Sequence, residues 1–288
     1  MFYKAIASAL YIRVLLGLLR AGWIEHMKIP VIKPSARRVL LTDGNGTIFP
    51  YGIRDYHADS RVREFLSLSA GSKSVQVVIV TNGSIESALG PAKEAGALLL
   101  AERGRVLVDP SRADSVKVLV NKDRLNLLFW QIIAPLDEFL ALRLPGHLKK
   151  EKLTMASYRP PEGITTSELC KTLEFFIGLM PKEVREITDI QAGRVSVDVA
   201  LRGEEKSKGI KDLYRLGILH PGIELLYTGD GRGDLGPFRL IQRLGGKVGA
   251  PANAEPEVVR YMKARGLEVH ELPDISFALM VLRRLTCL

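Results

Sequence analysis

The chain has 288 residues, of which 47% are hydrophobic and 25% are charged, as in ordinary globular proteins. This composition excludes a disordered chain, a coiled coil and a collagen-like fibre. Its two cysteines, Cys170 and Cys287, are too few for a disulfide scaffold. We therefore expect a folded protein in a reducing, cytoplasmic setting.

The net charge of +9 is concentrated at the N-terminus. Residues 1–38 contain seven lysines and arginines but one glutamate, so the other residues are nearly balanced. No nucleic-acid-binding motif and no basic stripe with interleaved aromatic residues follows, and we expect no nucleic-acid partner.

Residues 1–36 are predicted to form a basic, apolar, helical extension. Arg13 and Arg20 interrupt its apolar stretch, so no run reaches the ~18 uncharged residues of a membrane-spanning helix. Cations inside the stretch also disfavour a secretory signal. Three roles remain open for residues 1–24: a helix packed on the body or on a second subunit, a membrane-surface helix, or an extension upstream of a start at Met27.

Short strands alternate with helices in the next part of the chain, which indicates an α/β domain. The run Val75–Val80 is almost wholly apolar and β-branched, as expected for a strand buried on both faces of a parallel sheet. The predicted elements are strand 38–42, helix 61–68, strand 75–80, helix 84–95, and strands 97–101 and 105–108.

The pattern changes after residue 109 and returns near residue 208. The predicted middle elements are a first strand, helix 124–142, strand 153–158, helix 165–179, and strands 184–190 and 195–201. The later ones are helix 208–216, strand 224–227, helix 235–244, strand 247–249, and helices 255–265 and 276–285. We predict a Rossmann-like parallel-sheet core from residues 37–113 and 201–288, with an inserted α+β domain at 114–200.

Ligands bind open α/β sheets beyond the carboxyl ends of the strands. Two carboxylates from separate strand ends, Asp43 and Asp230, could hold Mg²⁺ through oxygen. Thr81, Asn82 and Lys208 supply a hydroxyl, backbone N–H groups and an ammonium for phosphate oxygens. Asp43 would then attack phosphorus as a covalent nucleophile, with Lys208 offsetting the charge of the transferring group.

In this order, these residues resemble the haloacid dehalogenase superfamily. Its first motif, Asp-x-Asp-Gly-Thr, is similar to Asp43–Thr47, and its second, a Thr or Ser ending a strand, is similar to Thr81. Lys208–Gly209 resembles the third motif and Gly229–Asp234 the fourth. The resemblance implies a Mg²⁺-dependent phosphatase of a small phosphorylated metabolite. It also implies metal ligation by Asp43, Asn45 (through its backbone carbonyl), Asp230 and Asp234.

The position of the insertion is similar to that of the family branch whose large α/β cap lies between the second and third motifs. That branch includes archaeal phosphoglycolate and sugar-phosphate phosphatases. Residues 101–104, 195–199 and 253–254 resemble further features of this branch. The resemblance spans about residues 37–285 and does not include the N-terminal extension.

Asn45 departs from the family pattern, which has an aspartate there as the catalytic acid and base. An amide can perform neither role, and general acid–base catalysis is typically worth about 10²–10⁴-fold. One hypothesis is a weakened or substrate-restricted phosphatase, and a second is a catalytically inactive protein that binds a phosphorylated metabolite or acts through protein interaction. A third is dinucleotide binding by Gly231-x-Gly233-x-x-Gly236, with Glu255 further on.

Overall fold

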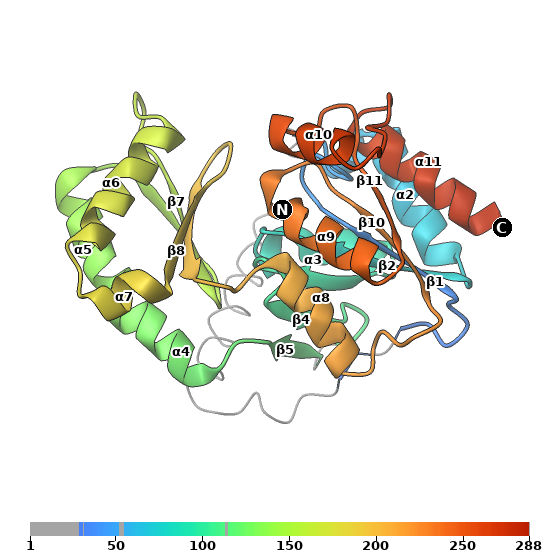
Figure 1. Cartoon of the computed structure of the whole chain (residues 1–288), viewed down its shortest axis with the longest axis horizontal. Helices are drawn as coiled ribbons and strands as arrows, with labels where there is room; N and C mark the ends of the chain where they lie inside the picture. The colour runs from blue at the N-terminus through green and yellow to red at the C-terminus, as the bar shows by residue number, and fades with distance from the viewer. Residues whose placement is uncertain (1–28, 31, 52–54, 113–114, 288) are drawn as a thin grey trace. The chain divides into compact units, whose positions relative to one another are not determined.

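The computed structural model describes residues 29–30, 32–51, 55–112 and 115–287 (Figure 1). The helix predicted at 1–24, its proposed contacts and Met27 lie outside the described residues. The chain divides into two compact units. The first comprises the described residues up to Val118 together with those from Glu205 onward, and the second is Leu119–Glu204.

The first unit is built on a seven-stranded sheet with the order β11-β10-β1-β2-β3-β4-β5. The five strands from β11 to β3 are parallel, whereas β4 and β5 join antiparallel. This confirms the predicted α/β class with a mainly parallel sheet. The strands are β1 Arg38–Thr42, β2 Val75–Val80, β3 Leu98–Ala101, β4 Val106–Val108, β5 Val116–Val118, β10 Glu224–Thr228 and β11 Lys247–Gly249.

The strand order reverses direction beside β1. From β1 the chain moves to β2 and β3 on one side, whereas β10 and β11 lie on the other. Arg38 is in register with Val75 of β2 and with Glu224 of β10. The carboxyl ends of β1 and β10 therefore meet at a topological switch point, where open α/β sheets bind ligands. All six residues of β2 are buried, as expected for an interior strand.

Two groups of helices cover the two faces of this sheet (Figure 1). Helices α2, α3 and α11 pack together, and α8 packs on α9. Because β1–β2 and β10–β11 step in opposite directions, right-handed crossovers place α2 and α9 on opposite faces. The helices are η2 Tyr56–Ala58, α2 Ser60–Gly71, α3 Ile85–Glu94, α8 Lys206–Arg215, η4 Arg232–Asp234, α9 Leu235–Arg243, α10 Pro256–Lys263 and α11 Asp274–Cys287.

The second unit is a four-stranded antiparallel sheet, β6-β7-β9-β8, with helices packed against it. Its α6 begins with a capping box, in which Thr165 and Glu168 satisfy each other's backbone N–H groups. The strands are β6 Leu148–Glu151, β7 Met155–Arg159, β8 Thr188–Ala192 and β9 Val197–Leu201. The helices are α4 Lys122–Leu127, η3 Leu128–Ile133, α5 Ala134–Arg143, α6 Thr166–Gly178 and α7 Lys182–Ile187.

Three sequence expectations differ from the structure. The first is the boundary at 114, because β5 at Val116–Val118 pairs with β4 of the large sheet. The strand expected at 184–190 is wrong for its first part, which forms α7 with a Lys182–Glu186 ion pair one turn apart. The third is β6, whose sequence Leu-Lys-Lys-Glu carries no apolar alternation and was not expected as a strand.

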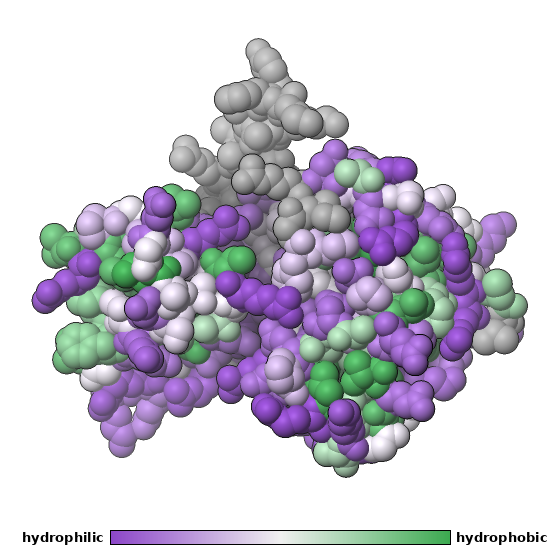
Figure 2. Space-filling model, turned by 90° about the horizontal axis from the view of Figure 1, so that it is seen from above, coloured by the Kyte–Doolittle hydropathy of each residue, from purple (hydrophilic) through white to green (hydrophobic). Residues whose placement is uncertain are grey.

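Among the described residues, Lys122–Arg143 is the helical stretch long and apolar enough, by length and composition alone, to cross a membrane. Its side chains Leu128, Ile132, Leu136 and Leu140 are fully buried within the structure. These positions recur at helical spacing, which is typical of a helix packed on a core. On the face drawn in Figure 2, hydrophobic residues stand among hydrophilic ones.

Candidate active site

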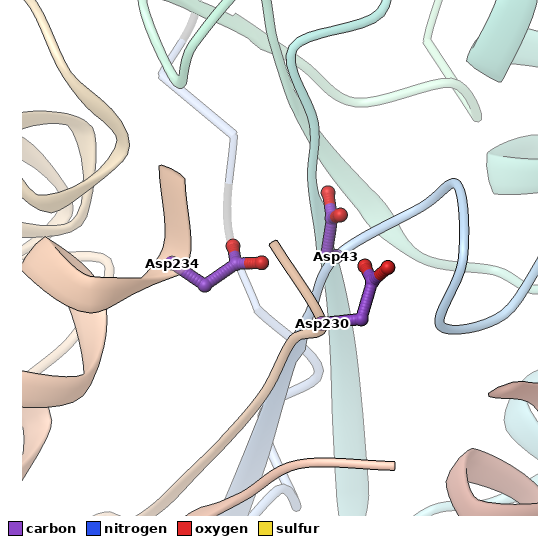
Figure 3. A group of neighbouring side chains, drawn as sticks. All are labelled: Asp43, Asp230 and Asp234. Carbon is purple, nitrogen blue, oxygen red and sulfur yellow. The ribbon is translucent and has the colours of Figure 1, made fainter. Parts of the chain in front are cut away.

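Three carboxylates meet at the carboxyl ends of β1 and β10 (Figure 3). Asp43 follows β1, Asp230 follows β10, and Asp234 lies in η4. One oxygen from each lies within 4.8 Å of the others, and all three residues are buried. The backbone N–H of Asp43 donates to the carbonyl of Thr228 at 2.8 Å, so the β1–β10 pairing itself places the Asp43 side chain.

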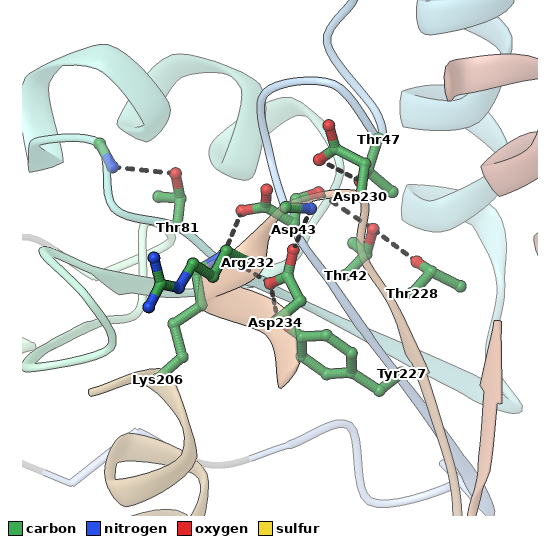
Figure 4. A network of polar contacts seen from close by, with 12 residues as sticks. Thr42, Asp43, Thr47, Thr81, Lys206, Tyr227, Thr228, Asp230, Arg232 and Asp234 are labelled. Carbon is green, nitrogen blue, oxygen red and sulfur yellow. Dashed lines mark hydrogen bonds and ion pairs between the residues drawn. The ribbon is translucent and has the colours of Figure 1, made fainter. Parts of the chain in front are cut away.

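One ammonium group lies inside this cluster (Figure 4). Lys206 Nζ donates to Asp43 Oδ1 and to Asp234 Oδ1, each at 2.7 Å, and its side chain is 3% exposed. Lys206 offsets only part of the negative charge that these three carboxylates carry when they are ionised. A buried excess charge is unfavourable unless another charge compensates it.

The pKa values of this cluster follow from burial and charge. Burial raises the pKa of Asp43 to about 8, and the nearby carboxylates of Asp234 and Asp230 act in the same direction against Lys206. Burial alone lowers the pKa of Lys206, but Asp234 and Asp43 outweigh it and hold that pKa above its ordinary value. The lysine therefore stays charged, whereas the proton on Asp43 depends on whether a cation is nearby.

Asp234 is held by donors on both carboxylate oxygens. Oδ1 accepts from Lys206 and, at 2.6 Å, from the Tyr227 hydroxyl, while Oδ2 accepts from the backbone N–H of Gly231 at 3.0 Å. A Cβ on Gly229 would lie 2.4 Å from Asp234 Cγ, so a side chain at that position would collide with the carboxylate. Asp234 therefore anchors the Lys206 ammonium beside Asp43.

Asp230 is held from the loop that follows β1. Thr47 donates its hydroxyl to Oδ1 at 3.3 Å, and Tyr51 donates its hydroxyl to Oδ2 at 3.1 Å. Gly46, at φ 81°, lies between the carboxylate and the Tyr51 ring, because a Cβ there would be 2.2 Å from Asp230 Oδ2. Asn253, in the segment after β11, donates to the Gly46 carbonyl at 2.8 Å and connects this loop to that segment.

Thr81 and Asn82 lie beyond β2, the neighbouring strand. Thr81 is buried beside the Asp43 loop, since a Cβ on Gly44 would lie 3.2 Å from its hydroxyl, and Asn82 is half-buried. The Thr81 hydroxyl accepts from the N–H of Gly83 at 3.0 Å. Helix α3 begins after this loop, and helix N-termini favour anions. The phosphate-binding roles of Thr81 and Asn82 stay predictions.

Lys208 is corrected by the structure, because the ammonium that contacts Asp43 belongs to Lys206. Lys206 is the first residue of α8, and a residue two positions later points about 200° around the helix axis. Gly209 has a packing role instead: a Cβ there would lie 2.1 Å from the Gly104 carbonyl oxygen. The Lys-Gly pair suggested a phosphate contact, whereas its glycine allows α8 to approach the loop after β3.

Sequence reasoning also missed Tyr51 and Tyr227. Tyr51 follows Pro50 in the loop after Asp43, and Tyr227 stands inside a predicted strand; neither spacing indicates a carboxylate partner. Asn45 is exposed, and its side chain forms no hydrogen bond with a described residue. Asp43 Oδ2 likewise accepts no hydrogen bond from the described part of the chain. This oxygen is therefore available to a metal ion or to phosphorus.

The cluster has the chemistry of a site for a hard divalent cation. Mg²⁺ prefers oxygen ligands at about 2.0–2.1 Å, so opposite ligands lie roughly 4.1 Å apart. The carboxylate oxygens here lie within 4.8 Å of one another, and the site carries excess negative charge. The residues present therefore fit a magnesium ion.

The dinucleotide hypothesis fits this loop poorly. Gly231 and Gly233 lie between Asp230 and Asp234, both fully buried. A pyrophosphate at these glycines would meet two carboxylates, and Glu255 Oε2 already accepts from the N–H of Arg232 at 2.7 Å.

No protein-family model and no curated protein matches the sequence. Several solved structures share its fold. The C-terminal domain of the trehalose-6-phosphate phosphatase of C. albicans is similar with a TM-score of 0.62 and 14% identity, covering 92% of this chain and 100% of that one. A haloacid dehalogenase-like hydrolase from Bacteroides thetaiotaomicron has a TM-score of 0.61 and 12% identity, covering 86% and 98%.

The sucrose-phosphatase of Synechocystis sp. PCC6803, solved with sucrose and phosphate, has a TM-score of 0.55 and 16% identity. It covers 87% of this chain and 98% of that one. At these identities the likeness concerns the fold. The chain has the haloacid dehalogenase fold, as the motif resemblance indicated.

Proposed function

We propose that this protein is a Mg²⁺-dependent phosphatase of a small phosphorylated metabolite, acting through an aspartyl phosphate on Asp43. The observation that carries the proposal is the buried group of Asp43, Asp230, Asp234 and Lys206 at the switch point of the sheet. The similar folds of a sucrose-phosphatase and a trehalose-6-phosphate phosphatase support a phosphorylated substrate.

Each residue of the site would have a distinct role. Asp43 Oδ2 attacks phosphorus, while Oδ1 stays on Lys206, which keeps the attacking oxygen oriented. The Lys206 ammonium also offsets charge on the transferring phosphoryl group. Thr81 and Asn82 at the start of α3 bind phosphate oxygens.

Asp43 and Asp230 would hold the magnesium ion with the backbone carbonyl of Asn45, and Asp234 would complete the negative charge around it. A bound Mg²⁺ supplies positive charge to the phosphoryl oxygens. Thr47 and Tyr51 keep Asp230 in place for this role. We also propose that the inserted unit acts as a cap domain that selects the substrate. We assign the protein to the cytoplasm.

The test is a Mg²⁺-dependent screen of phosphorylated metabolites with wild type, Asn45→Asp and Asp43→Asn. Asn45→Asp should raise the turnover of an alkyl phosphate by roughly 10²-fold or more, because it restores a proton-transfer group. Asp43→Asn should abolish turnover in both backgrounds. If wild type, with asparagine intact at position 45, already turns over the alkyl phosphate as fast as Asn45→Asp, position 45 is not the acid–base site.

A second candidate is a catalytically inactive protein that binds a phosphorylated metabolite, and Asn45 is the observation that favours it. In that case neither form hydrolyses any phosphate ester, while phosphate or a sugar phosphate still binds in titration calorimetry. The same screen therefore separates the two functions.

A further inference from the structure

The release of a phosphoryl group from Asp43 requires a base that takes a proton from water. In phosphatases this proton moves as water attacks phosphorus, and the base contributes typically about 10²–10⁴-fold. Asn45 occupies the expected position of that base, and its amide accepts no proton at neutral pH. The amide is exposed and holds no neighbouring side chain in place.

No other group in the cluster is placed to substitute for this base. The acidic side chains that the structure groups with Asp43 are Asp230 and Asp234. Asp234 accepts hydrogen bonds from Lys206, Tyr227 and the backbone of Gly231, and both oxygens of Asp230 also accept hydrogen bonds. Lys206 and Tyr227 act here as donors. Among the described residues of the cluster, the carboxylates that could accept a proton from water are thus already engaged in hydrogen bonds.

Formation of the phosphoenzyme depends less on a proton-transfer group at position 45. Asp43 Oδ2 carries no hydrogen bond from the described residues, and Lys206 holds the other oxygen. An acyl or aryl phosphate releases its leaving group as a carboxylate or aryloxide, which departs without a proton. The two half-reactions are therefore affected unequally by the asparagine.

We propose that Asp43 forms a long-lived aspartyl phosphate, so that this chain accumulates as a phosphoprotein in the presence of acyl or aryl phosphates. The proposal rests on the proposed function, because it requires Asp43 to be the nucleophile. It identifies release, rather than formation, as the slow step, and it makes an acyl or aryl phosphate the class of donor.

The atoms and charges balance in both steps. In formation, an Oδ2–phosphorus bond forms and the bond from phosphorus to the leaving oxygen breaks, its electron pair staying with the carboxylate or aryloxide. In release, a water oxygen bonds to phosphorus, the Oδ2–phosphorus bond breaks, and Asp43 regains its carboxylate. The water proton then passes to bulk solvent, because residue 45 does not accept it.

The experiment follows the covalent state of the full-length protein with Mg²⁺ and either acetyl phosphate or 4-nitrophenyl phosphate. Quenched samples are measured by intact mass spectrometry and then treated with hydroxylamine, which cleaves acyl phosphates. Four proteins are compared: wild type, Asn45→Ala, Asn45→Asp and Asp43→Asn. Asn45→Ala is the matched control, because alanine also lacks a proton-transfer group.

Wild type and Asn45→Ala should be mostly phosphorylated at steady state and should release about one equivalent of 4-nitrophenol in a burst. Asn45→Asp should show little phosphoenzyme, because its release step is faster by roughly 10²–10⁴-fold. Asp43→Asn should show none. After removal of the donor, the wild-type phosphoenzyme should decay more slowly than that of Asn45→Asp by the same factor.

Steady phosphate release by wild type without phosphoenzyme would overturn this inference and leave the proposed function intact. Phosphoenzyme in Asn45→Asp equal to that in wild type would also overturn it. If all four proteins show neither phosphoenzyme nor phosphate release, the proposed function itself fails. Asn45 precedes Gly46, and Asn-Gly pairs deamidate readily, so peptide mass spectrometry must first show that wild type still contains asparagine.

Discussion

A single lysine joins carboxylates that reach the site from different loops. Lys206 Nζ contacts Asp43 beyond β1 and Asp234 in η4, and these two residues have no direct hydrogen bond of their own. Its positive charge stabilises the buried carboxylates of Asp43 and Asp234. Removing one partner of a buried ion pair typically costs about 3–5 kcal/mol.

Lys206→Met should therefore lower both stability and activity. We expect a lower melting temperature in EDTA and a loss of phosphoryl transfer of at least about 10²-fold, because the positive charge that would offset the transferring phosphoryl group is lost. Lys208→Met is the matched control. It should keep the wild-type melting temperature and a rate of phosphoryl transfer within a few-fold of wild type. Inactive Lys208→Met beside active Lys206→Met would reverse the assignment.

Tyr51→Phe tests whether a hydroxyl outside the proposed set of metal ligands supports Asp230. The phenylalanine keeps the ring against Gly46 and removes the hydroxyl that donates to Oδ2 at 3.1 Å. Loss of such a partner typically weakens metal binding by about 10–100-fold. Titration calorimetry with Mg²⁺ on the substrate-free protein should show this weakening.

Tyr56→Phe serves as the control, since the Tyr56 hydroxyl contacts Glu94 instead of the cluster. Tighter Mg²⁺ binding in Tyr51→Phe would instead mean that the hydroxyl competes with the metal for Asp230.

At the scale of elements, helix α8 reaches the site through a close backbone crossing. Glu102, Arg103 and Gly104 are consecutive left-handed residues, at φ 53°, 61° and 76°, and the turn they form meets α8 at Gly209. A Cβ at position 209 would lie 2.1 Å from a backbone oxygen, which cannot rotate away. The approach of α8, and with it the position of Lys206, depends on this glycine.

Gly209→Ala should destabilise the protein by about 1–3 kcal/mol, as expected when a group is forced into a packed site. Gly71→Ala is the control: that glycine also lies in a helix, and its added Cβ would meet nothing within 4 Å. It should be neutral or stabilising by up to about 1 kcal/mol. Urea unfolding measures the change in the free energy of unfolding for both variants. Equal changes would contradict the inference that α8 packs closely on the loop after β3 at Gly209.

The same elements show what the sequence could predict. The apolar runs of β1 and β2 and the carboxylates that follow β1 and β10 were predictable, because hydrophobic patterning and strand ends are local signals. The choice between Lys206 and Lys208 was not, since it depends on the residue at which α8 begins and on its rotation. Tyr51 was missed for a related reason: its partner Asp230 is distant in sequence, and only tertiary structure brings the two together.

At the scale of the molecule, the acidic cluster should make stability depend on pH and on metal. The folded state raises the pKa of Asp43 from 3.8 to about 8. Between these values the native state holds a proton that the unfolded state releases, so this contribution favours folding at low pH and is lost as pH rises toward 8. In EDTA, the melting temperature should fall between pH 6 and about pH 8.

Mg²⁺ should reverse most of that fall, because a cation that binds only the folded state stabilises it. Asp43→Asn lacks the titrating carboxyl and should show a weaker fall in EDTA. Differential scanning calorimetry across this range measures both effects. A wild-type melting temperature that rises with pH in EDTA would contradict the burial argument.

The pairing of β1 with β10 also bears on how the protein is made. Arg38 and Glu224 are in register although 186 positions separate them along the chain. While the ribosome is still synthesising the inserted unit, Asp43 has emerged but its partners Asp230 and Asp234 have not, and one edge of β1 has no neighbour. Closing so long a loop is slow compared with local folding. A nascent chain can therefore contain Asp43 without Asp230 and Asp234, and the acidic cluster can assemble only after residue 234 has been synthesised.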